Sequence, residues 1–287
     1  MITDHHMHLE HDAVVGPCRY DAARISEYAA AARRRGVDQI GISEHCHRFV
    51  EFRPIMASLT EPVPAIGGDW LLPHFNHHLD DYVQGVIEAQ RQGLPVLLGL
   101  EADFLPGCET AVRAVLEKYP WDYVLGSVHF LTRPGGRAWA IDSDPGAGWP
   151  DTDVDEAYRS YFATLQGAAA SGLFDIMAHP DLIKKFGHRP SFDPQSLYDE
   201  TAAVFKQSGV AAELSTAGWH RPVMEAYPAP GFLRALAKAE VPITLGSDAH
   251  EPGEVGLDFD RALVLARQCG HREPVFFKNR ARQSGQR

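Results

Sequence analysis

The stretch VPITLGSDAH at residues 241–250 joins a short apolar run to an aspartate and a histidine. The run at residues 241–245 is continuous, without polar alternation, which is typical of a parallel strand buried on both faces. Asp248 and His250 follow it and stand two residues apart, so in extended chain their side chains face the same way. The stretch therefore predicts a buried strand whose end carries a carboxylate and an imidazole.

The same combination, an apolar run followed by His, Asp or Glu, recurs elsewhere in the chain. It occurs as DHHMH at 4–8, SEH at 43–45, GLE at 99–101, GSVH at 126–129 and AHPD at 178–181. Functional residues of α/β barrels lie at the C-terminal ends of the strands. The repeated strand ends therefore predict a ring of ligands around several metal ions, and His with carboxylate suits zinc, manganese or iron.

Helical patterns alternate with these strands from one end of the chain to the other. The helices are expected at residues 22–35, 75–92, 108–118, 155–170, 194–207, 231–239 and 258–269. The further strands are expected at residues 37–42, 95–100, 123–128, 174–178 and 210–214. About seven βα units in this order predict an α/β fold with right-handed crossovers. Ligands after every strand favour a barrel, since an open sheet would gather them at one switch point.

One barrel domain is expected over residues 1–277, followed by a polar tail at 278–287 that we expect to be flexible. Two long loops, 48–74 and 131–152, interrupt the alternation. They carry Trp70, Trp139 and Trp149. Loops of this length in a compact domain are usually functional or disordered, and their aromatic residues favour ordered lids over the site.

The composition, 45% apolar and 23% charged, is that of a soluble globular protein. The sequence contains no apolar run long enough for a membrane span and no secretory signal at its start. Four scattered cysteines without a CxxC pair argue against a disulfide framework and favour a reducing cytoplasm. The net charge of −11 argues against nucleic acid as a partner. It still allows a small phosphorylated substrate, because bound divalent cations would reverse the local sign.

Together, the motifs DxHxH, EH, GLE, GSVH, AHPD and SDAH resemble the polymerase-and-histidinol-phosphatase (PHP) metallophosphoesterases along nearly the whole chain. Within that family the chain most resembles the histidinol-phosphatase branch. The segments that carry this are GLEADF at 99–104, DYVLGSVH at 122–129, KKFGH at 184–188, STAG at 215–218 and LGSDAH at 245–250. The resemblance implies a distorted TIM-like (β/α)7 barrel with two to three divalent metal ions at the C-terminal ends of the strands.

The resemblance also implies a ligand set. A first ion would be held by His6, His8, Glu101 and Asp248, and a second by Glu101, His129 and His179, with Glu101 bridging the two. A third would be held by His45, His250 and a histidine of the loop after the first strand. The family usually places that histidine where this chain has Val14, so His11 is the expected substitute.

The activity implied is that of a phosphomonoesterase converting L-histidinol phosphate and water to L-histidinol and phosphate, late in histidine biosynthesis. A hydroxide shared by the metals would attack phosphorus. Glu101 and Asp248 would be catalytic, with Asp181 as a candidate proton donor. Arg221 is the first candidate for phosphate, because a guanidinium can hold two oxygens at once. The other candidates for contacts to the substrate are Lys184, Lys185 and His47, although the two lysines could equally be a solvated surface pair.

Three alternatives stay open at this point. The same chemistry could act on a nucleotide or an oligonucleotide end, although the acidic charge counts against it. An amidohydrolase barrel also opens with HxH, but such barrels commonly bridge two metals through a modified lysine, and here Glu101 fills that place. A catalytically silent metal-binding subunit would not need so complete a set of ligands. The sequence does not decide the oligomeric state.

Overall fold

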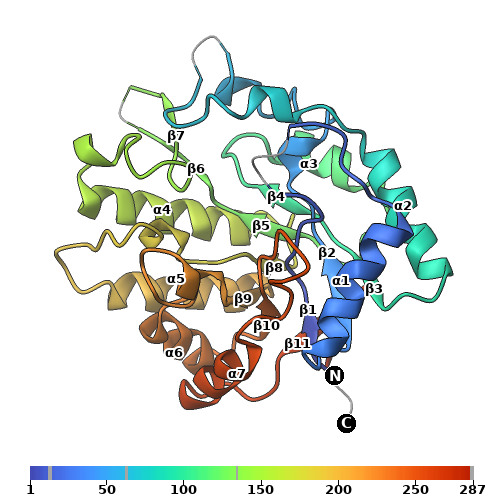
Figure 1. The fold of residues 1–287 in the computed structure, drawn as a ribbon. Coiled ribbons are helices and arrows are strands. Elements are labelled where there is room, and N and C mark those ends of the chain that lie inside the picture. Colours follow the sequence, from blue (N-terminus) through green and yellow to red (C-terminus); the bar gives the residue numbers. More distant parts are fainter. Residues whose placement is uncertain (12–14, 62–63, 134, 285–287) are drawn as a thin grey trace.

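The computed structural model describes residues 1–11, 15–61, 64–133 and 135–284, so Val14 lies outside the described residues. Within these ranges, eight parallel strands form the main sheet in the order β3-β2-β1-β10-β9-β8-β5-β4 (Figure 1). Their bounds are β1 Thr3–Asp4, β2 Gln39–Ile42, β3 Val96–Leu98, β4 Glu101–Asp103, β5 Leu125–Ser127, β8 Ile176–Met177, β9 Ala211–Ser215 and β10 Ile243–Gly246.

The two edge strands of this sheet, β3 and β4, belong to one continuous segment, residues 96–103. The first half of the segment pairs with β2 through Ile42 and Leu98, and the second half pairs with β5 through Glu101 and Leu125. A bridge between His45 and Glu101 continues the pairing with the chain that follows β2. Because β3 and β4 belong to one segment, they count together as one strand of the barrel. The sheet therefore closes on itself as a distorted seven-stranded barrel. This confirms the expected (β/α)7 architecture.

The helices lie around the strands (Figure 1). They are α1 Ala22–Arg34, α2 Leu79–Arg91, α3 Glu109–Leu116, α4 Val154–Ala170, α5 Gln195–Ser208, α6 Pro230–Lys238 and α7 Phe259–Gln268. Local chemistry explains where several of these helices begin or end. Asp153 caps α4 by accepting from two backbone N–H groups, and α5 stops at Gly209, which has a φ of 77°. No helix in the described ranges is long and apolar enough to cross a membrane.

Tyr123 fills the inside of the barrel beneath the strand ends. Its hydroxyl donates to the backbone oxygen of His5 at 2.6 Å, just before the first ligand pair. A Cβ at Gly41 or Gly99 would come within 2.1 or 2.4 Å of the tyrosine side chain. Glycine at those two positions therefore makes room for Tyr123. The floor of the site rests on a packed interior, which holds the strand ends in place.

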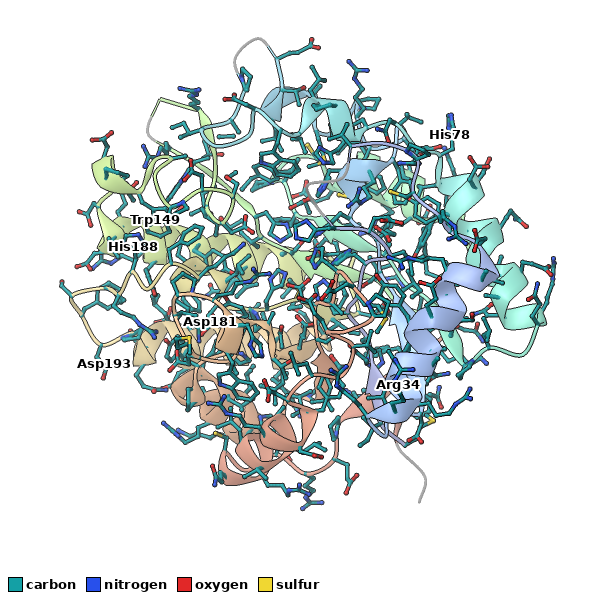
Figure 2. The ribbon with its side chains drawn as sticks, viewed as in Figure 1. Arg34, His78, Trp149, Asp181, His188 and Asp193 are labelled. Atoms are coloured by element: carbon teal, nitrogen blue, oxygen red, sulfur yellow. The ribbon has the colours of Figure 1, made fainter. Side chains whose placement is uncertain are left out.

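In their described residues, the two long loops pair with each other. β6 Phe130–Thr132 and β7 Ala138–Ala140 form an antiparallel hairpin. Ile66 exchanges backbone hydrogen bonds with Ala138 and Ala140, which joins the first loop to the hairpin. Trp139 and Trp149 are buried against each other with ring centroids 4.8 Å apart. Trp149 also stacks on His188 at 4.0 Å, and Figure 2 shows these two side by side.

The C-terminal part of the chain returns to the barrel. β11 Val275–Lys278 and β12 Ala281–Ser284 form a hairpin that spans the domain boundary expected at residue 277. Phe277 is buried with Tyr123 and other residues inside the barrel. Arg280 donates to both carboxylate oxygens of Asp175. These contacts hold the hairpin against the end of the barrel opposite the predicted ligands.

Candidate metal centre

Glu101 lies at the centre of the converging side chains. It is 1% exposed and begins β4, in the segment that closes the barrel. Its Oε2 lies 2.6 Å from His45 Nδ1 and 3.4 Å from His6 Nε2. Its Oε1 lies 3.0 Å from His179 Nε2 and 3.6 Å from His129 Nε2. The two oxygens of one carboxylate thus face two different sets of imidazoles, as a bridging ligand requires.

The first set lies beside β1 and β10. His6 and His8 are fully buried, and because they stand two residues apart in the segment that continues β1, both rings face the same group of ligands. Asp248 Oδ1 lies 3.6 Å from His6 Nε2 and 3.4 Å from His8 Nε2. Asp248 has a φ of 55°, and its N–H donates to the His6 carbonyl, so a turned backbone brings its carboxylate to the pair. These three side chains could hold one cation.

The second set lies beside β5 and β8. His129 donates from Nδ1 to Asp103 at 2.8 Å, which turns Nε2 toward Glu101. The rings of His129 and His179 are 5.2 Å apart. His179, Glu101 and His6 form a second group whose ligand atoms could share an ion. The structure thus brings together every residue expected at the first two ions.

A third group consists of His8, His45 and His250. The His8 and His45 rings stack at 3.9 Å, and the rings of His8 and His250 are 4.5 Å apart. His11 is exposed, and its ring lies 5.8 Å from that of His250, so it borders this group without joining it in the described structure. The place expected for His11 is therefore near the ligands, but here His8 completes the group.

Buried polar atoms in this centre fit a metal. Among the described residues, His6 Nε2 and His8 Nε2 are buried and have no hydrogen-bond partner. Leaving such atoms unsatisfied is costly in a packed interior. Imidazole nitrogen and carboxylate oxygen are donors that zinc and other transition metals accept. A cation among these atoms would remove the cost, so the residues present fit the expected group.

The pKa values of the proposed ligands shift in different directions. Burial, together with the neighbouring His45 and His250, holds the pKa of His8 well below its ordinary value, which keeps its ring neutral. Burial alone would raise the pKa of Glu101, but the surrounding histidines, His45 and His6 first, hold it well below its ordinary value. A neutral His8 beside an ionised Glu101 is the pattern that metal binding needs. Burial would lower the pKa of His6 and His129, but nearby carboxylates raise the first well above its ordinary value and the second to about 9, so a cation would displace a proton from each of these rings.

Two neighbouring cavities border the centre. The inner one measures about 40 Å³ and is lined by residues that include His179, Arg221, Asp248 and Lys185. The outer one measures about 450 Å³ and is lined by His47, Trp70 and Phe130 among others. Both cavities are bordered by His45, His129, Asp142 and Lys185. The site therefore has a narrow polar floor beneath a wider, partly aromatic entrance.

Of the residues expected to contact the substrate, three line these cavities. Arg221 faces the inner cavity. Lys185 lines both, and its Nζ donates to the Asp142 carboxylate at 3.0 Å. His47 lines the outer cavity, with its ring 4.8 Å from that of Trp70. The structure thus leaves two cationic side chains beside the ligands, one of them paired with a carboxylate.

Lys184 and Asp181 lie elsewhere. Lys184 is 1% exposed, and its Nζ lies 2.8 Å from Asp181 Oδ2 and 2.9 Å from Glu225 Oε2. Asp181 is 1% exposed and also accepts from the Ala229 N–H at 2.7 Å. These two residues form a buried ion pair that holds the loop after β8 to the segment before α6. Neither side chain lines the two cavities, so this geometry does not support a substrate contact for Lys184 or a proton-donor role for Asp181, and both expectations stay predictions.

Sequence reasoning assigned no role to three acidic residues of the site. Glu213 in β9 accepts from His6 Nδ1, Asp103 in β4 accepts from His129 Nδ1, and Asp142 faces Lys185 between the two cavities. A usable signal existed for Glu213, because it is the single charged residue in the apolar run at 210–214. Asp103 stands two residues after Glu101 and so faces the same side. Asp142 lies in a loop, where spacing predicts no partner.

A parallel barrel whose strand ends gather imidazoles and carboxylates defines the class of metal-dependent hydrolases. The PHP domain family matches residues 4–217, and the chain belongs to this family. It is 39% identical over 272 residues to a probable histidinol-phosphatase of Deinococcus radiodurans, covering 93% of this chain and 95% of that protein. It is 23% identical to the histidinol-phosphatase of Bacillus subtilis over 83% of this chain and 91% of the relative.

The fold also matches a solved structure. A histidinol phosphate phosphatase of Lactococcus lactis, crystallised with zinc, L-histidinol and phosphate, superimposes with a TM-score of 0.73. The sequences are 18% identical, and the alignment covers 99% of each chain. The likeness shows that both chains share this distorted barrel from end to end.

Proposed function

We propose that this chain is a metal-dependent phosphomonoesterase that hydrolyses L-histidinol phosphate to L-histidinol and phosphate. The observation that carries the chemistry is Glu101, whose two oxygens face separate sets of imidazoles at the barrel mouth. The choice of substrate is supported by the relative in Deinococcus radiodurans, which bears a histidinol-phosphatase name and matches nearly the whole chain.

We further propose that two or three divalent ions, zinc, manganese or iron, occupy the centre. His6, His8 and Asp248 would hold one, Glu101, His129 and His179 another, and His45 and His250 a third with His8 or His11. Bound ions would lower the pKa of a water molecule and neutralise charge on the phosphoryl group. The donor set suits all three metals, and metal supply in the cell would select among them.

Residues of the chain itself would bind and orient the ester. Arg221 and Lys185 border the inner cavity and supply positive charge to the non-bridging phosphate oxygens. Asp248 borders the same cavity, where its carboxylate can accept a proton from the attacking water. Since the phosphate would lie on the polar floor, the alcohol part of the ester would extend into the outer cavity.

The outer cavity suits the alcohol part of this ester. Its aromatic lining, from Trp70, Phe130 and His47, can pack against an imidazole. Asp142, at the junction of the two cavities, offers a carboxylate to the ammonium group of an amino alcohol. A volume of about 450 Å³ lies within the range of ordinary small-molecule sites.

The barrel and the β11–β12 hairpin held against it would act as a single domain in a reducing compartment, the cytoplasm. The described cysteines are all unpaired, which supports this placement.

The test is a panel of esters assayed by phosphate release with Mn²⁺, Zn²⁺ or Fe²⁺. The panel comprises L-histidinol phosphate, a nucleoside monophosphate and an oligonucleotide with a terminal phosphate. We expect kcat/KM for L-histidinol phosphate to exceed the others by about 100-fold or more, or about 2.7 kcal/mol. Faster turnover of a nucleotide would overturn the substrate assignment. Hydrolysis of amides or lactones without phosphate release would overturn the reaction class.

A further inference from the structure

Glu213 is a fully buried carboxylate in the middle of β9, set among apolar neighbours. Its Oε1 lies 2.8 Å from His6 Nδ1, and its Oε2 accepts the backbone N–H of His179 at 2.5 Å. His6 and His179 follow different strands, β1 and β8, on either side of β9 and β10. One carboxylate therefore contacts two proposed ligands that belong to different strands.

The contact with His6 determines how that ring can act. A carboxylate oxygen accepts a hydrogen bond, so in this contact His6 carries a proton on Nδ1. The other nitrogen, Nε2, faces Glu101 and Asp248 at 3.4 and 3.6 Å and is the atom that would bind a cation. Imidazole ligands are commonly held in this way by a carboxylate on the opposite ring nitrogen, which fixes both tautomer and ring orientation.

The contact with His179 holds an unusual backbone. His179 has a φ of 25°, a conformation that costs free energy for a residue with a side chain. Its N–H points at Glu213 Oε2, and its Nε2 lies 3.0 Å from Glu101. A charge-assisted hydrogen bond at the turn offsets part of that cost. The same turn aims the imidazole at the centre.

Gly246 lets Glu213 reach across the barrel. β10 lies between β9 and β1, so the side chain of Glu213 must pass over β10 to reach His6. A Cβ built on Gly246 would lie 1.8 Å from Glu213 Oε1. No positive φ requires glycine at this position, so the requirement is one of space. The chain thus pairs a buried acid with a glycine that admits it.

We propose that Glu213 is a positioning residue that fixes the tautomer of His6 and the backbone of His179, and that Gly246 is needed for it to do so. The inference rests on the proposed metal centre. Glu213 contacts ligand residues but contributes no ligand atom of its own. Its loss is expected to weaken metal binding rather than to unfold the barrel.

The primary test is Glu213→Gln, which keeps the shape of the side chain. A carboxamide has one acceptor oxygen, so it cannot accept from both His6 and His179. We expect metal affinity, measured by competition with a chelator, to fall about 10–100-fold. The thermal midpoint of the metal-free variant should stay within a few degrees of the wild type. Unchanged metal affinity would overturn the proposal.

A second variant, Gly246→Ala, keeps the carboxylate but displaces it. We expect metal affinity to fall in this variant as well. Adding Gly246→Ala to Glu213→Gln should cause a smaller further loss than the same substitution causes in the wild type, because the two residues act through one contact. Additive losses would contradict the shared mechanism. If Glu213→Gln folds poorly, Gly246→Ala alone tests whether the Glu213 contact supports metal binding.

The matched control is Asp122→Asn, at a buried carboxylate that accepts from the Leu98 N–H at 2.9 Å before β5. It should lower stability and leave metal affinity unchanged. If the control weakens metal binding as much as Glu213→Gln does, a general loss of packing explains both and the proposal fails. Wild-type protein that binds no metal would instead refute the proposed centre itself.

Discussion

The two carboxylate oxygens of Glu101 face different imidazoles, and the surrounding histidines keep the group ionised despite its burial. At the scale of single residues, the proposed chemistry depends on this side chain more than on any one histidine. Loss of His8 leaves the group of His6, Glu101 and His179 intact. Loss of Glu101 removes a ligand that faces both sets of imidazoles.

Glu101→Gln is therefore expected to lower kcat by about 10²–10³-fold or more, because the charge that holds two ions together is lost. The variant should fold, since the amide fills the same volume. Steady-state kinetics and circular dichroism on the same sample would check this. Turnover close to that of the wild type would show that Glu101 does not bridge.

Arg221 and Lys184 provide a matched pair of cations. Arg221→Ala is expected to raise KM for the ester about 10–100-fold, because a charge-assisted contact to phosphate is lost. Lys184→Met is expected to leave KM unchanged and to lower the free energy of unfolding by about 3–5 kcal/mol, because the buried Asp181 would lose its cation. Kinetics and denaturant unfolding of both variants would distinguish the two roles. The reverse pattern would contradict the assignment.

Among the elements, strand ends were predictable and the orientation of the following loop was not. Short apolar runs ending in His, Asp or Glu placed Glu101, His129, His179 and Asp248 at the barrel mouth. The AHPD segment shows the limit. The positive φ of His179 turns the chain, so Asp181 points inward to Lys184 and not to the cavity. Spacing along a chain carries no information on such a turn.

The packing of α6 against the end of α7 predicts a pH effect. His271 donates from Nε2 to the Leu233 carbonyl in α6, and burial lowers the pKa of this ring. The unfolded chain therefore takes up this proton at a higher pH than the folded chain does, and stability falls as the pH drops below about 6.5.

His271→Gln keeps an N–H donor and removes the titration. We expect the fall in thermal midpoint between pH 7 and pH 5 to be smaller in this variant than in the wild type. Thermal unfolding scans of both proteins at several pH values in one buffer series, without added metal, would measure this difference. An identical fall in both proteins would show that His271 does not contribute.

For the whole molecule, the alternation of strands and helices was enough to predict a barrel, but the way it closes was not predictable. Closure depends on residues 96–103 pairing on both sides, whereas the apolar run indicated a strand ending at residue 100. The role of Glu213 was not predicted, for a related reason. Its partners His6 and His179 are 207 and 34 residues away and meet it only once the barrel has formed.

The metal-free centre holds buried polar atoms without partners, so metal should stabilise the folded chain as a whole. At a free metal concentration of 100 times Kd, linkage predicts about 2.7 kcal/mol for one ion. Removing metal with a chelator should lower Tm by several degrees, and readdition should restore it. Glu101→Gln should show a smaller shift, and an equal shift in that variant would place the ions elsewhere.

The most direct measurement is anomalous diffraction from crystals of the metal-loaded protein, collected at the absorption edge of the added metal. The account predicts at least two peaks bridged by the carboxylate of Glu101, one beside His6, His8 and Asp248 and the other beside His129 and His179. Peaks away from Glu101, or a single ion that leaves one of these two sets without metal, would contradict it.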